Sequence, residues 1–422
     1  GSACKTTLQM LDPVAHLGLR LALGAFRTSP VESLYTEADE PPLKLRRKKL
    51  ALQYSLRLAA HPENPTYNIV YDPKHTQLYK NKEKATPSFG LRMQPILKEL
   101  GLQQDRTIVE STPQIPPWTL TPPDVNFEVG KQTKKSETAE IMYKAKFGEI
   151  LNKYPEYRRF YTDGSKSDEA VAAAAVRPDK TISEAYNKNI SIFTAEIRAI
   201  ELALNEIHAG RDKKHIIFSD SKSALQALQD QWTPNPEVRR VLELHHKIRK
   251  TKDILFCWVP SHIGIKGNEA ADRAAKAALT SPVSNSSVPA TDWIPKATEY
   301  VKKEREKQWE NVETNKLKEI VPNLAEHKQI QCVNRHDEVV LTRLRIGHSR
   351  LTHSYLMKGE PAPKCIGCDT GFTIKHILLE CVDFADTRKL FYECRDLYSL
   401  FTTVAKEKIL DFIREIGLYY KI

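Results

Sequence analysis

Residues 158–176 read RRFYTDGSKSDEAVAAAAV and decide the fold of the middle of this chain. A short apolar run leads into the pair Asp163-Gly164, and a second apolar run follows after a few polar residues. This pattern predicts two strands, 158–165 and 170–176, joined by a turn. A carboxylate at the end of a buried strand loses its hydration, which is costly unless a partner compensates for it. Asp163 is therefore the first candidate for a functional residue.

Strand and helix patterns alternate in the residues that follow. The helix 193–209, for example, places Ile197, Ile200, Leu204 and Ile207 at spacings of three and four residues. Three strands followed by alternating helices and strands predict an α/β domain, a mixed five-stranded sheet with helices on its faces. The further expected strands are 181–189, 214–221 and 254–260, and the further helices are 221–230, 235–250 and 268–279.

Composition limits the class of protein. The 422 residues are enough for two or three domains, and 41% hydrophobic with 28% charged residues is typical of a soluble globular protein. No apolar run approaches the roughly 20 residues of a membrane-spanning helix, and no signal peptide is seen, so we expect no membrane partner. The net charge of +11 favours a polyanionic partner. The seven scattered cysteines argue against a disulfide scaffold.

The flanks of the α/β region differ from it. Helices are predicted over 14–26 and 41–65, and a Pro- and Thr-rich stretch over 111–135 predicts a linker or an extended wrap, with a short helix after it at 137–152. A Ser- and Pro-rich break at 280–290 precedes a mainly helical remainder. We therefore predict four segments: 1–110, helical; 111–153, linker and helix; 154–280, the α/β domain; and 281–422, helical with a Cys/His cluster.

Four acidic residues stand at informative places in the α/β domain. Asp163 and Asp220 each end a buried strand, where sites form in α/β sheets. Glu196 and Asp272 lie in helices, and each taken alone could be an ordinary surface acid or helix cap. If the two strands are neighbours, the carboxylates repel unless a cation lies between them. Oxygen ligands suit Mg²⁺ or Mn²⁺, and two such ions would serve phosphodiester cleavage.

Four sequence blocks then resemble the ribonuclease H type 1 family in order and spacing: YTDGS (161–165), TAEIRAIELAL (194–204), FSDSKSAL (218–225) and WVPSHIGIKGNEAADRAAKAA (258–278). The resemblance implies that Asp163, Glu196, Asp220 and Asp272 bind two catalytic Mg²⁺ or Mn²⁺ ions. It also implies that His262 assists proton transfer and product release. The alternative for His262 is an ordinary loop histidine. Some family members carry a basic, Trp-rich protrusion, whereas here only Trp232 and nearby basic residues stand in its place.

The outer segments resemble a different context. The N-terminal stretch LDPVAHLGLRLALGAFRTSPVESLYTEADEPPLKLRRKKLALQY (11–54) is similar to the thumb- or connection-like segment after the palm in non-LTR (LINE-type) retrotransposon polyproteins. The Tyr-x-Asp-Asp-type polymerase motif does not occur, so we expect a truncated copy or a C-terminal fragment without polymerase activity.

The C-terminal cluster Cys365-x2-Cys368-x7-His376-x4-Cys381 offers three thiolates and an imidazole, which suit structural Zn²⁺. It is similar to the terminal CCHC element of those polyproteins; ordinary reduced cysteines are the alternative. The nearby Arg343, Arg345 and Arg350 are expected to form a phosphate-contacting surface. For His348 and His353 in the same stretch, ordinary polar surface is the alternative.

The sequence thus predicts an enzyme that hydrolyses the RNA strand of RNA–DNA hybrids. Its expected partners are the hybrid, RNA and DNA, and its expected location is intracellular, in the nucleus or the cytoplasm. The alternative from another class is a catalytically silent nucleic-acid-binding remnant. An integrase-like nuclease would lack the loop SHIGIKGNE (261–269), which is present.

Overall fold

The computed structural model of the chain describes residues 3–74, 77, 79, 86–102, 107–110, 113–130, 140–285 and 287–422. Residues 111–112 and 131–135 of the expected linker and residues 137–139 of the expected helix lie outside the described residues. Two compact units are formed: unit 1 is Gly1–Ala51, His75–Phe89 and Ala297–Ile422, and unit 2 is Leu52–Lys74 and Gly90–Lys296. The sequence-based boundaries placed the first 51 residues and the last 126 in different segments, whereas their contacts join them in unit 1.

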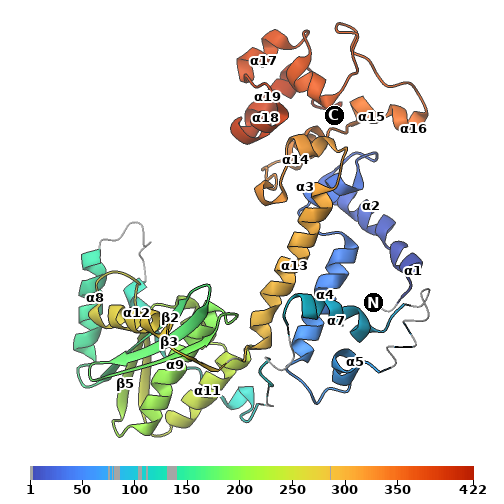
Figure 1. Ribbon diagram of the computed structural model, residues 1–422. Helices are drawn as coiled ribbons and strands as arrows, with labels where there is room; N and C mark the ends of the chain where they lie inside the picture. Colours follow the sequence, from blue (N-terminus) through green and yellow to red (C-terminus); the bar gives the residue numbers. More distant parts are fainter. Residues whose placement is uncertain are drawn as a thin grey trace. The chain divides into compact units, whose positions relative to one another are not determined.

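Unit 2 is built on a mixed sheet with the strand order β1-β6-β5-β2-β3-β4-β7 (Figure 1). The predicted fold class is confirmed, because the five expected strands form the centre of this sheet. Two short edge strands extend it, and they are too short to show an alternating pattern in the sequence. The strands are β1 (Val125–Asn126), β2 (Arg158–Lys166), β3 (Ala170–Arg177), β4 (Lys180–Asn187), β5 (Lys214–Ser219), β6 (Asp253–Trp258) and β7 (Val283–Asn285).

Strand direction follows the connections. Tight turns join β2, β3 and β4 into an antiparallel meander, while helical crossovers make β5 parallel to β2 and β6 parallel to β5. The edge strand β1 is parallel to β6. Because β1 lies in the Pro- and Thr-rich stretch, this part of the chain is an extended wrap that adds to the sheet.

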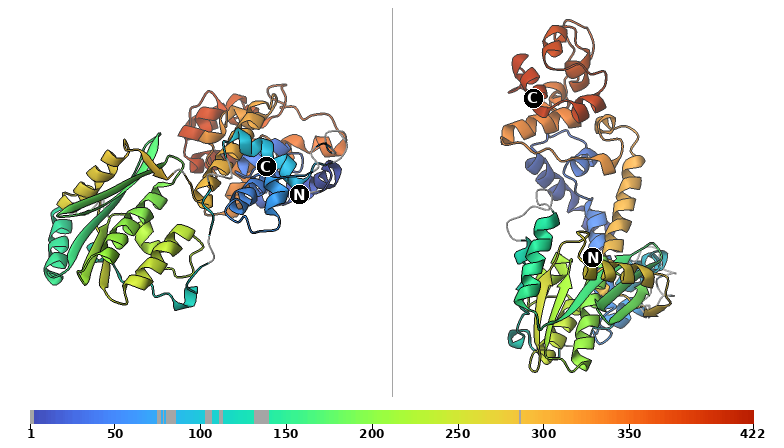
Figure 2. Two further views of the ribbon diagram at one scale, coloured as in Figure 1. Left: turned by 60° about the horizontal axis from the view of Figure 1, so that its bottom comes forward. Right: turned by 90° about the vertical axis from the view of Figure 1, so that its left-hand side faces the viewer.

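Helices cover both faces of the sheet (Figure 2). Successive strand residues point to opposite faces, so Phe160 packs in the core under α9 and α11, while Tyr161 packs in the core under α8 and α12. Strand β3, next to the central strand β2, is rich in alanine and buried from Ala170 to Val176, which lets helices approach closely from both sides. The helices are α8 (Glu140–Lys153), α9 (Ile192–Ala209), α10 (Lys222–Ala227), α11 (Pro236–Ile248) and α12 (Lys266–Ala278).

Unit 1 is helical, and its core is contributed mainly by the C-terminal residues, including Trp309, Leu344, Ile377 and Phe412. The N-terminal helices pack against α14 of this unit. Gly24 ends α2 in the left-handed conformation (φ 64°), earlier than the expected helix end, and its backbone lies close to Val339. The helices are α1 (Lys5–Gln9), α2 (Asp12–Leu23), α3 (Val31–Glu37), α14 (Arg335–Ile346), α15 (Arg350–His353), α16 (Tyr355–Lys358), α17 (Ala385–Phe391), α18 (Leu397–Thr403) and α19 (Lys406–Glu415).

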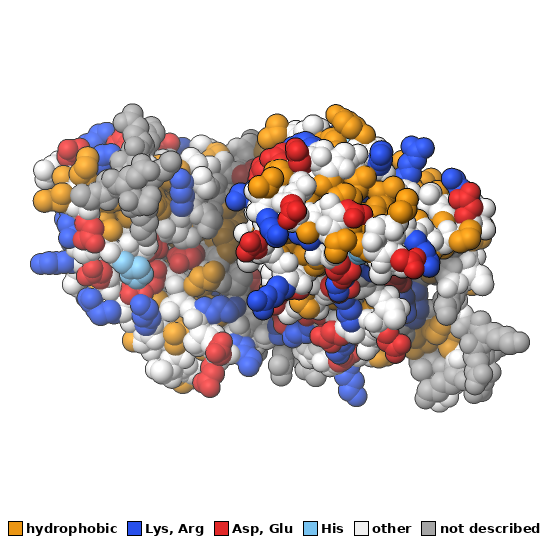
Figure 3. Space-filling model, turned by 90° about the horizontal axis from the view of Figure 1, so that it is seen from above, with side chains coloured by type: hydrophobic (Ala, Val, Ile, Leu, Met, Phe, Trp, Pro, Cys, Tyr) orange, Lys and Arg blue, Asp and Glu red, His pale blue; other side chains and the backbone are white. Residues whose placement is uncertain are grey.

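The remaining helices are α4 (Leu43–Leu58), α5 (Tyr67–Tyr71), α7 (Phe89–Glu99) and α13 (Ala290–Glu310). None of the described helices combines the length and apolar composition that crossing a bilayer requires. Lys and Arg side chains are spread among Asp and Glu over the face shown in Figure 3. The positive net charge is therefore not gathered into one patch on that face.

Candidate active site

The candidate site lies where β5 ends beside β2. Contrary to expectation, Asp163 does not end its strand, because β2 continues beyond it in pairing with β3. Strands β2 and β5 are parallel neighbours, and the last matched pair in their register is Thr162 with Ser219. The next residues along the two strands are Asp163 and Asp220, so the register brings these carboxylates together at the same edge. Carboxylate oxygens of Asp163, Glu196 and Asp220 lie within 4.8 Å of one another. The structure thus joins three of the four acids that the sequence singled out.

Glu196 reaches this edge from α9, which approaches β2 very closely. A Cβ atom on Gly164 would lie 3.0 Å from Ala195 Cβ and 3.0 Å from the Glu196 nitrogen. A glycine at position 164 therefore lets α9 approach β2 this closely, whereas any larger residue would push the helix or the strand away. Glu196 is 7% exposed, and its Oε2 atom is buried without a hydrogen-bond partner among the described residues.

Burial and neighbouring negative charges destabilise the charged forms of the three carboxylates. Burial raises the pKa of Asp163 to about 7, and repulsion from Asp220 and Asp272 adds to the increase. Burial, with repulsion from Asp163 and Asp220, raises the pKa of Glu196 well above its usual range. Burial also raises the pKa of Asp220. A bound cation would remove this penalty, and the all-oxygen donor set fits Mg²⁺ or Mn²⁺. The orphaned oxygen of Glu196 is a ready ligand atom.

Asp272 stands apart from the other three acids. It lies on α12 and pairs with Lys276 one turn later at 2.9 Å, although its charge still raises the pKa of Asp163. His262 is exposed in the loop before α12 with a left-handed backbone (φ 57°). The buried neighbours Ile263 and Ile265 fix this loop in the core of unit 2.

Two residues support Asp220 that the sequence analysis did not single out. Asn268, which is 3% exposed, donates from Nδ2 to Asp220 Oδ2 at 3.1 Å, and Trp258 Nε1 donates to the Asp220 carbonyl at 3.0 Å. Both belong to the block 258–278 that also holds His262. Each carries a polar group on an otherwise apolar face of its strand or helix, and this pattern could have identified both residues from the sequence.

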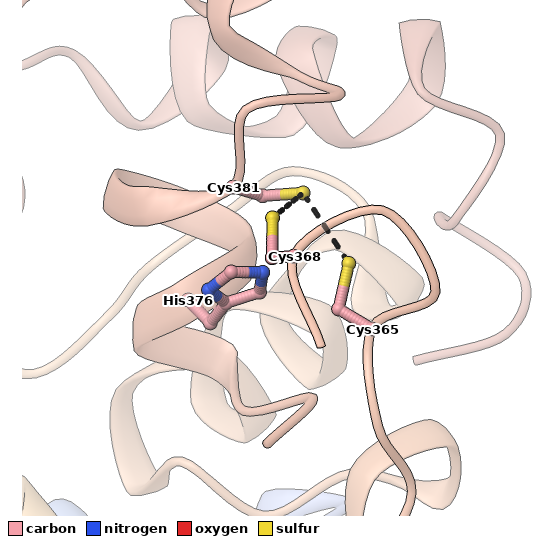
Figure 4. A group of neighbouring side chains, drawn as sticks. All are labelled: Cys365, Cys368, His376 and Cys381. Atoms are coloured by element: carbon pink, nitrogen blue, oxygen red, sulfur yellow. Dashed lines mark hydrogen bonds between the residues drawn. The ribbon is translucent and has the colours of Figure 1, made fainter. Parts of the chain in front are cut away.

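A second cluster lies in unit 1, where Cys365, Cys368, His376 and Cys381 converge (Figure 4). The Sγ atoms of Cys365 and Cys368 lie 3.8 Å and 3.9 Å from that of Cys381, too far for a disulfide, and all three thiols are free. The four ligand atoms lie within 4.8 Å of one another, and His376 Nε2 is buried without a hydrogen-bond partner among the described residues. Three sulfur atoms and one imidazole nitrogen in this arrangement fit tetrahedral Zn²⁺.

The arginines beside this cluster do not form the expected phosphate-contacting surface. Arg345 is buried and pairs with Glu37 at 2.8 Å, and Arg343 donates to the carbonyls of Gly24 and Ile422. Only Arg350 is exposed. The guanidinium groups of the other two hold helix α14 to the N-terminal segment and to the C-terminus, both within unit 1.

The alternative of ordinary polar surface does not fit His348 and His353, because His353 is buried and His348 is partly buried beside it. Their rings stack at 3.7 Å, and His353 is 6% exposed. His353 Nε2 lies 3.0 Å from Lys316 Nζ, and His348 Nδ1 lies 3.2 Å from Thr28 Oγ1. These contacts make the pair part of the packing of unit 1.

The part of the chain that holds the candidate site matches a known family. Residues 155–280 match the RNase H family, so the sheet and helices of unit 2 contain an RNase H domain. The chain is 33% identical over 125 residues to the Pol polyprotein of Equine infectious anemia virus (strain Wyoming), covering 28% of this chain and 10% of that protein. It is 26% identical over 229 residues to the Pol polyprotein of Caprine arthritis encephalitis virus (strain Cork), covering 49% of this chain and 19% of that protein. The chain thus spans a tenth to a fifth of these relatives' length.

Proposed function

We propose that unit 2 hydrolyses the RNA strand of RNA–DNA hybrids. The observation that carries the proposal is the group of three converging carboxylates, two buried and one partly buried, inside the residues that match the RNase H family. Asp163, Glu196 and Asp220 would hold Mg²⁺ or Mn²⁺, with Asp272 completing a site for two ions. When bound, these ions would activate the attacking water and stabilise the leaving oxygen.

The chain's own residues prepare this edge. Asn268 holds the Asp220 carboxylate in one orientation, and the close approach of α9 to Gly164 sets the separation of Asp163 from Glu196. His262 is exposed beside them and can exchange a proton with water or with a departing product.

The wider context is also a proposal. Relatives that are Pol polyproteins support a replication protein, and the N-terminal stretch and the Cys/His cluster resemble non-LTR retrotransposon proteins. We propose that the chain is part of such a protein, acts on hybrid in the nucleus or cytoplasm, and holds one structural Zn²⁺ at Cys365, Cys368, His376 and Cys381. The proposed Zn²⁺ would link the segment 364–371 to the helical turn that begins at His376.

The test is cleavage of a labelled RNA–DNA hybrid by the full chain with Mg²⁺ or Mn²⁺. Asp220→Asn keeps the size of the side chain and removes one negative charge. Activity should fall by more than the roughly 10–100-fold that is typical when a residue orienting a metal ligand is lost. Asp179→Asn is the matched control, because this exposed acid of the β3–β4 turn is paired only with Arg177 in the described structure; its activity should equal that of the wild type.

Binding separates this function from the alternative. Hybrid binding should survive Asp220→Asn and weaken steeply with salt, since phosphate contacts come from other residues. If wild type and Asp220→Asn bind hybrid equally and neither cleaves it with either ion, the chain is a binding remnant and the enzyme proposal fails.

A further inference from the structure

The first turn of α9 is held by a carboxylate from a distant part of the chain. Ser191 is the N-cap of this helix, and its side chain accepts a hydrogen bond from the Thr194 backbone nitrogen at 3.1 Å. Asp292 accepts from the Ser191 backbone nitrogen at 2.9 Å, from Ser191 Oγ at 3.0 Å and from Thr194 Oγ1 at 3.1 Å. The carboxylate therefore binds the capping residue and orients its hydroxyl group. A negative charge is also favourable at this end of a helix.

Asp292 lies outside the residues that match the RNase H family. It belongs to the first turn of α13, after the match has ended at residue 280. The segment that carries it is fixed to unit 2, because β7 pairs with β4 and Val288 forms a β-bridge with Thr107. Trp293, the next residue, is 1% exposed. Asp292 is therefore presented to α9 by a docked segment.

The helix that Asp292 holds is the one that delivers Glu196. Glu196 is the fifth residue of α9, one turn from the cap, and its Oε2 atom has no hydrogen-bond partner among the described residues. The Gly164 backbone holds the Glu196 carboxylate by a hydrogen bond, and the place of the side chain also depends on the backbone of the first turn of α9 that carries it. The close contact at Gly164 sets the distance of this turn from β2, and the bonds to Asp292 hold Ser191 and Thr194 at the start of the helix.

We propose that Asp292 is a positioning residue for the carboxylate site, acting through α9 to place Glu196 for the divalent cation. This inference rests on the proposed function for the identity of the cation. The metal site would then depend on a segment that follows the residues matching the RNase H family.

The experiment measures Mn²⁺ binding to the full chain by calorimetry, without nucleic acid, together with the Mg²⁺ concentration that gives half-maximal hybrid cleavage. Asp292→Ala should weaken Mn²⁺ binding by about 10-fold, the lower end of the range for residues that orient metal ligands. Asp292→Asn should show a smaller change in the same direction, because the amide keeps one acceptor oxygen. Thr194→Val removes the Thr194 hydroxyl, which donates to Asp292 and accepts from Ser191 Oγ, and should also weaken Mn²⁺ binding slightly. This variant tests the inference if Asp292→Ala does not fold.

Asn235→Ala is the matched control for a purely structural role. Asn235 caps α11 in the same unit by accepting from the Glu237 and Val238 nitrogens, and α11 carries none of the four acids. Its loss should lower thermal stability and leave Mn²⁺ affinity unchanged. If the foldable Asp292 and Thr194 variants bind Mn²⁺ as tightly as the wild type, the inference is overturned. If the wild type binds Mn²⁺ but does not cleave hybrid while the Asp292 variants bind it more weakly, the proposed function fails and the positioning role stands.

Discussion

The buried ion pair between Glu37 and Arg345 should dominate the stability of unit 1. The Glu37 and Arg345 side chains are 2% and 9% exposed, and two hydrogen bonds of 2.8 Å and 3.3 Å join them. Glu37→Gln would leave the guanidinium charge buried without its counter-charge. Breaking such a pair costs about 3–5 kcal/mol, against a total stability of roughly 5–15 kcal/mol for a typical protein. We therefore expect unit 1 to be largely unfolded at urea concentrations that leave the wild type intact.

The assay is urea unfolding followed by circular dichroism, with hydrogen exchange to assign the loss to α3 and α14, whose amides should lose protection together. The double variant Glu37→Gln, Arg345→Met should recover most of the stability, because an uncharged pair of similar volume avoids the desolvation of two charges. The control Asp386→Asn removes one partner of an exposed pair with Lys389 and should cost less than about 1 kcal/mol. A loss of less than about 1 kcal/mol in the free energy of unfolding for Glu37→Gln would refute the reasoning, since it would mean that water solvates the Arg345 guanidinium charge.

Three further outcomes are expected. Gly164→Ala should cost about 1–3 kcal/mol by overpacking against α9 and should weaken Mn²⁺ binding, whereas Gly148→Ala, with open space around it, should do neither; equal behaviour of the two would contradict the close approach. Elemental analysis of the wild type should find one Zn²⁺ per chain, and Cys368→Ser should lose this ion and raise hydrogen exchange around the cluster while hybrid cleavage is retained; a wild type without zinc would refute the metal site. Burial lowers the pKa of His348 to about 3 and of His353 to about 4, so the stability they contribute is present above pH about 6.5 and is lost as pH falls toward 4. Between about pH 6.5 and pH 4, the urea midpoint should therefore fall less steeply with pH in the double variant His348→Gln, His353→Gln than in the wild type. Identical pH dependence of the two midpoints would contradict the burial of these histidines.

The sequence was sufficient for the α/β unit because its signals are local. An acid that follows the apolar run of each of two strands, and a helix with apolar residues at spacings of three and four, follow from a few adjacent residues. The register between β2 and β5 then brings Asp163 and Asp220 together, as expected for parallel neighbours. The convergence of Cys365, Cys368, His376 and Cys381 was predictable for the same reason, since their spacing is short.

Contacts between residues far apart in the sequence could not be predicted from local sequence patterns. Arg345 follows Leu344 in a run that looks like a basic surface, and nothing near it in sequence indicates that its partner is Glu37, 308 residues away. Asp292 resembles an ordinary first-turn acid of its own helix, although it bonds to Ser191 of another. Tertiary packing decided both cases. The short strands β1 and β7 escaped prediction because two or three residues cannot show a period.

The composition of unit 1 also has a consequence for how the chain is made. Its N-terminal helices leave the ribosome before the whole RNase H domain, while α14, against which they pack, is translated only afterwards. About 245 residues separate the two parts, and at about 5–20 residues per second their synthesis takes roughly 12–50 s. During that interval Glu37 is a solvated acid without Arg345, and the apolar side of α3 has no core to join. The domain in the middle can fold during the same interval. A released fragment that ends at residue 296 should thus have native hydrogen-exchange protection in the sheet and none in α3.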